Sequence, residues 1–180
     1  VMECVEHNAR VGERIAFFEL GPVFIPLEKY DPISGAICKE PKQLAIVLSG
    51  ARTYPNWDAQ KSPLMDFYDL KGVIFDLLEA LHFTASRFVP FEHPTFHSGK
   101  CAKIFVPSSP SSKTENDHSA EIYLGMLGEP HPLVRENYEE LPSAPILAAL
   151  LDMEALHSAL PSHITVQPVP IFPPVLEDLA

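Results

Sequence analysis

Two stretches of the 180-residue sequence, RIAFFEL at residues 14–20 and QLAIVL at residues 43–48, decide the fold. The first is rich in the aromatic and β-branched side chains that are typical of strands. The second stretch is almost continuously apolar, as expected of a strand that is covered on both faces. The first continues through a Gly-Pro pair at residues 21–22, which favours a bend or bulge, into strand-like sequence at 23–25. Together they predict one long hairpin over residues 14–50.

Helical patterns lie on both sides of this hairpin. Residues 1–11 place apolar side chains near one helical face and precede Gly12, where a left-handed C-cap would sit. The clearest helix is predicted over residues 66–81, because its apolar side chains repeat at steps of three and four. Helical spacing also covers residues 132–140.

Shorter strands are predicted between and after these helices. A compact turn at 93–99 should join the first two strands, and Gly128 should turn the chain after the third. The resulting order of elements indicates an α+β fold with a mostly antiparallel sheet. The predicted strands cover residues 87–91, 101–106, 121–127 and 145–151.

The composition narrows the class of protein. A formal net charge of −11 repels a polyanion, so any RNA contact should be local. Cys4, Cys38 and Cys101 are widely separated and form no C-x-x-C pair, which suits a reduced, cytoplasmic protein. No apolar run approaches the roughly 20 residues that span a bilayer, so neither export nor insertion is expected. Because the sequence starts at Val1 inside a helical pattern, we expect a piece of a longer chain.

Three histidines are the candidates for a metal site. His93, His97 and His131 lie in turn-like sequence, and zinc needs three or four such ligands. Against this, Pro94 separates the first two, which disfavours the shared helical face of paired metal ligands. The favoured alternative is that these are loop histidines bonded to backbone.

Other reactive side chains have structural interpretations. Asp66, Asp69 and Asp76 lie near the strongest predicted helix, where a pair could act as acid and base. We favour Asp66 as a helix cap over a catalytic role. Cys101 lies in an apolar strand context and is interpreted as a buried structural thiol. Neither a P-loop nor a G-x-G-x-x-G motif occurs, so nucleotide binding has no support from the sequence.

Five ordered motifs resemble the bacterial-type phenylalanyl-tRNA synthetase beta chain, in its catalytic-like core domain. The segment HPTFHSGKCA looks like the family's H-P-x-x-H-P-G-x-x-A, and the last motif is similar to the entry into the C-terminal anticodon-binding domain. The resemblance covers nearly the whole chain. The motifs are FFELGPVF (17–24), DFYDLKG (66–72), HPTFHSGKCA (93–102), LGEPHP (127–132) and PIFPPVLEDLA (170–180).

The resemblance implies a class II synthetase fold without the residues for chemistry. Residues 1–10 would end the motif 1 helix, an interface element, and the hairpin over 14–50 would be motif 2. Ile25 stands where motif 2 has the arginine that binds the ATP α-phosphate. Near the place of the motif 3 arginine stands Ala155. The three histidines become structural signatures, and we predict no catalytic, cofactor-binding or metal-binding residue.

The resemblance also implies a function. Residues 1–167 would be a catalytic-like domain, and the proline-rich 168–180 a connector into an anticodon-binding domain. The expected role is structural: assembly with the catalytic alpha subunit as a heterotetramer of two alpha and two beta chains. That holoenzyme would use ATP and magnesium and charge tRNA(Phe), whereas this chain alone would be inactive. The alternatives are a stand-alone, histidine-dependent metallohydrolase or a small protein-binding module.

Overall fold

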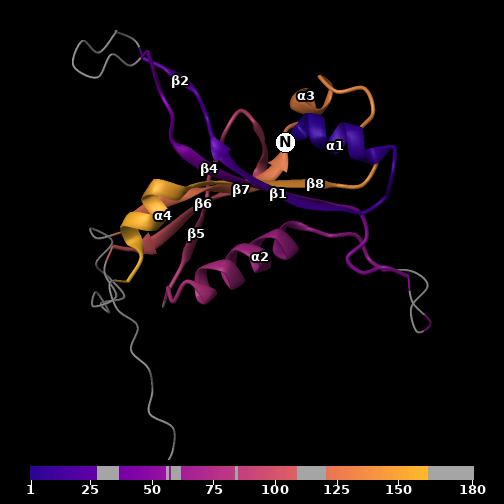
Figure 1. Cartoon of the computed structure of the whole chain (residues 1–180). Helices are drawn as coiled ribbons and strands as arrows, with labels where there is room; N and C mark the ends of the chain where they lie inside the picture. Colours follow the sequence, from indigo (N-terminus) through magenta and orange to yellow (C-terminus); the bar gives the residue numbers. More distant parts are fainter. Residues whose placement is uncertain (28–36, 56, 58–61, 84, 109–120, 162–180) are drawn as a thin grey trace, which may run out of the picture.

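The computed structural model contains an antiparallel sheet flanked by helices, which confirms the predicted α+β class (Figure 1). The six-stranded sheet has the order β1-β4-β8-β7-β6-β5. The structure describes residues 1–27, 37–55, 57, 62–83, 85–108 and 121–161. Its elements are α1 (Met2–Ala9), β1 (Ile15–Pro22), β2 (Ile25–Pro26), β3 (Cys38–Lys39), β4 (Lys42–Ser49), α2 (Phe67–Ala80), β5 (Arg87–Pro90), β6 (Phe96–Pro107), β7 (Glu121–Pro130), α3 (Pro132–Arg135), β8 (Ile146–Asp152) and α4 (Met153–Ala159).

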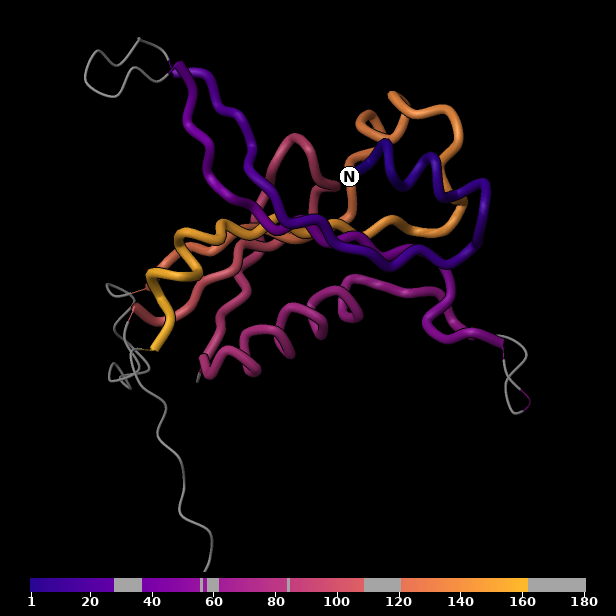
Figure 2. Tube along the Cα trace, in the orientation of Figure 1, coloured from indigo at the N-terminus to yellow at the C-terminus, as the bar shows by residue number. Residues whose placement is uncertain are grey.

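The long hairpin is confirmed, and the alternative of a bulge at its Gly-Pro pair is wrong, although the strand is interrupted between Pro22 and Ile25. Pro22 pairs with Lys42 in β1–β4, and Ile25 pairs with Lys39 in β2–β3, in one unbroken register. Proline fits here because β1 is an edge strand, where a missing N–H need not break a ladder bond. Figure 2 shows β2 and β3 continuing the hairpin outward as an arm that projects from the sheet.

Two hydrophobic clusters lie on opposite faces of the sheet, because side chains alternate along each strand. In β4, Ile46 joins the cluster beneath α2, whereas Val47 joins the cluster beneath α1. Figure 1 shows α1 and α3 on one side of the sheet and α2 on the other. The larger cluster includes the buried stripe of α2, formed by Leu70, Ile74 and Leu78.

The pairing of β6 with β7 extends further than predicted. The compact turn expected at 93–99 is shorter, because strand β6 already begins at Phe96. The residues between Phe96 and Cys101 belong to β6, where the pairing with β7 shifts its register. Gly128 does not turn the chain, since it pairs with Cys101 inside the sheet. A Cβ atom there would lie 2.5 Å from the carbonyl oxygen of Lys100, so the close approach of the backbones explains the glycine.

The helices differ from prediction at their ends. α1 is capped by Arg10 in the right-handed conformation, and Gly12 has no positive φ, so the left-handed C-cap is wrong. α3 has four residues instead of the nine expected over 132–140. α4 was not predicted, although Asp152 caps it by accepting from two backbone N–H groups.

No helix among the described residues is long and apolar enough to cross a membrane. The boundary predicted between residues 167 and 168, and most of the loop predicted over 107–119, lie outside the described part of the chain.

Candidate functional site

Asp66 and Asp69 form a reciprocal cap at the start of α2. The Asp66 carboxylate accepts from the backbone N–H of Tyr68 and Asp69, and the Asp69 carboxylate accepts from the N–H of Asp66 at 2.7 Å. Arg52 then binds both oxygens of Asp69, at 2.7 and 2.9 Å. These bonds confirm the cap interpretation of Asp66 and occupy both carboxylates structurally. Asp76 lies apart, exposed further along α2.

The Arg52 fork changes the ionisation of its partner. The hydrogen bond that Arg52 donates lowers the pKa of the Asp69 carboxyl, against the opposing effect of partial desolvation. A carboxylate held charged in this way accepts hydrogen bonds well but is a poor general acid near neutral pH.

The three candidate histidines bond to nearby backbone, as their favoured interpretation expects, but His97 lies within strand β6 and not in a loop. Among the described residues, no three His, Cys, Asp or Glu side chains gather in a group that could hold a metal ion. His131 also caps α3. The ring partners are the N–H of Thr95 for His93, the carbonyl of Ser98 for His97 and the N–H of Leu133 for His131, at 3.3, 2.6 and 3.2 Å respectively.

Cys101 is buried in β6, as predicted. Burial raises the pKa of the Cys101 thiol, so the thiolate that a nucleophile needs is disfavoured. The prediction of a structural thiol is confirmed.

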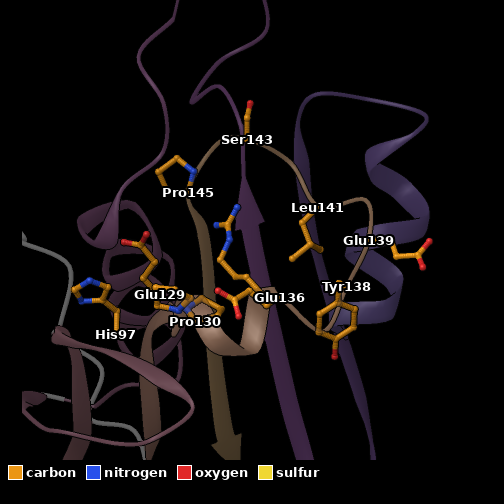
Figure 3. A pocket seen from close by; sticks show the side chains of 11 residues that line it. His97, Glu129, Pro130, Glu136, Tyr138, Glu139, Leu141, Ser143 and Pro145 are labelled. Atoms are coloured by element: carbon orange, nitrogen blue, oxygen red, sulfur yellow. The ribbon is translucent and has the colours of Figure 1, made fainter.

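A shallow cavity of about 560 Å³, largely open to solvent, lies where the end of β7 meets α3 and the segment 136–145. Figure 3 shows His97 and Glu129 on one side of it, with Tyr138 and Leu141 on the other. Arg135 lines it as well and donates from Nη2 to the carbonyl of Pro142 at 2.8 Å. Glu129 is held by Lys100 at 2.5 Å. Prolines supply much of the remaining wall.

This cavity offers no assembled catalytic group among the described residues, because no hydrogen bond joins His97 to the hydroxyl of Tyr138 or Ser143. A nucleophile and its base must normally lie within hydrogen-bond reach. Sequence reasoning found His97 but missed the cavity, because its walls are more than 30 residues apart along the chain. The proline-flanked LGEPHP motif was the available signal.

The two positions that lack an expected arginine lie in different surroundings. Ile25 is on the projecting arm, 46% exposed, with the exposed Lys39 directly opposite on β3. Ala155 is in the first turn of α4, where its N–H donates to the Asp152 carboxylate at 2.9 Å and its side chain packs against the larger cluster. Neither side chain can bind a phosphate. The residue paired with Ile25 across the hairpin, Lys39, carries a positive charge.

Comparison with known families gives a match over most of the chain. The model of the phenylalanyl tRNA synthetase beta chain CLM domain matches residues 1–153. The chain belongs to this family. The match includes the arm, the capped start of α2, the cavity and all of β8, whereas Ala155 lies just beyond the matched residues.

Curated relatives agree with this membership. The chain is 31% identical over 181 residues to the phenylalanine–tRNA ligase beta subunit of Symbiobacterium thermophilum, covering 100% of the chain and 18% of the relative. It is 34% identical over 184 residues to that of Burkholderia lata, covering 100% and 20%. For Clostridium acetobutylicum the identity is 30% over 182 residues, covering 100% and 19%. The chain thus spans about one fifth of the length of these relatives.

Proposed function

We propose that this chain is a non-catalytic structural domain of the beta subunit of phenylalanine–tRNA ligase. In this proposal it has the class II synthetase type of fold and supports assembly with the catalytic alpha subunit. Two alpha and two beta chains would form the enzyme that charges tRNA(Phe) with ATP and magnesium. Membership of the beta-chain family carries the proposal.

The proposed lack of adenylation by this domain follows from its missing positive charges. Adenylation builds negative charge at phosphorus, and its transition state needs cations that are already in place. Ile25 and Ala155 occupy the two positions where the resemblance puts arginines, and neither side chain carries a charge. The paired carboxylates at the start of α2 and the backbone-bonded histidines supply no replacement.

The histidine-dependent hydrolase has weaker support. The three histidine rings bond to backbone groups within two residues of themselves, and the described residues offer no metal-binding group. A small binding module is also compatible with the fold, but membership of the beta-chain family favours the first proposal.

Calorimetric titration tests the lack of ATP chemistry. The 180-residue chain is titrated with ATP and magnesium, then with phenylalanine, beside the isolated alpha subunit. We expect no heat of binding from the chain, because the arginines that would bind the phosphates are missing. The informative variant is Lys39→Ala, which removes the cation opposite Ile25. An ATP signal in the wild type that disappears in Lys39→Ala would show that the arm binds phosphate and would contradict the proposal.

A further inference from the structure

We draw no further inference here: the strongest candidate, the exposed apolar row of Phe18 and Leu20 on the edge strand β1, carries nothing, because the chain spans about one fifth of the length of its relatives and nothing in the structure shows what covers this face.

Discussion

Asp69 shows how one side chain can serve two structural tasks. Its carboxylate accepts the backbone N–H of Asp66 and both donor groups of the Arg52 fork. The sequence indicated the cap at Asp66, because an acidic residue precedes a helical apolar pattern. It did not indicate Arg52, which is 17 residues away and reaches Asp69 only through tertiary structure. Local rules therefore predict a residue's role when its partners are near in the chain.

The lowered pKa of Asp69 gives a prediction about acid stability. Its folded-state pKa lies below the ordinary value of 3.8, so its contribution to stability is complete above that value. The contribution is lost as the pH falls through the folded-state pKa. We expect Asp69→Asn to lower the free energy of unfolding by about 1 kcal/mol at pH 7. The gap to the wild type should close as the pH falls below 3.8.

Urea unfolding at stepwise pH measures this gap. Asp76→Asn on the same helix is the control, because Asp76 is exposed and outside the cap. Its unfolding free energy should follow that of the wild type at every pH. A difference between Asp69→Asn and wild type that stayed constant down to pH 2 would contradict the ionic origin of the effect.

Elements with a strong internal period were predictable, and elements shaped by neighbouring backbones were not. The hairpin and α2 follow from patterns within a few residues of one another. The continuation of β7 past Gly128 depends on Lys100, whose backbone passes close enough to exclude a side chain. The missed α4 had a local signal, since Asp152 precedes apolar side chains at helical spacing. This signal is hard to recognise in the sequence, because the apolar strand β8 ends at Asp152, directly before α4 begins.

Two glycines in different elements should respond oppositely to alanine. Gly72 lies inside α2, and an added Cβ would meet nothing within 4 Å, so Gly72→Ala should stabilise the protein by roughly 0.5–1 kcal/mol. Gly125 in β7 has φ +155, and an added Cβ would lie 2.0 Å from the carbonyl oxygen of Leu150. Gly125→Ala should cost about 3 kcal/mol or prevent folding. Thermal unfolding of both variants checks the pair, and equal shifts would contradict the steric argument.

At the level of the whole molecule, the two hydrophobic clusters share their strands. β4 and β8 each send alternate side chains into both clusters, so neither cluster can be lost without disturbing the strands that hold the other. The class of fold followed from the sequence because the order of elements left few alternatives to an antiparallel sheet. The exposure of Phe18 and Leu20 on β1 did not, because periodicity shows which residues share a face and not whether a helix covers that face.

The shared strands predict that the chain unfolds in one cooperative transition. Ile74→Ala removes side-chain volume from the cluster beneath α2 and should cost about 2–5 kcal/mol. Val5→Ala opens the cluster beneath α1 and should cost about 2 kcal/mol. Because Val47 and Ile46 couple the clusters through one strand, each variant should shift a single melting transition recorded by calorimetry and by backbone circular dichroism. Two separate transitions, with each substitution moving only one of them, would mean that the faces of the sheet fold independently.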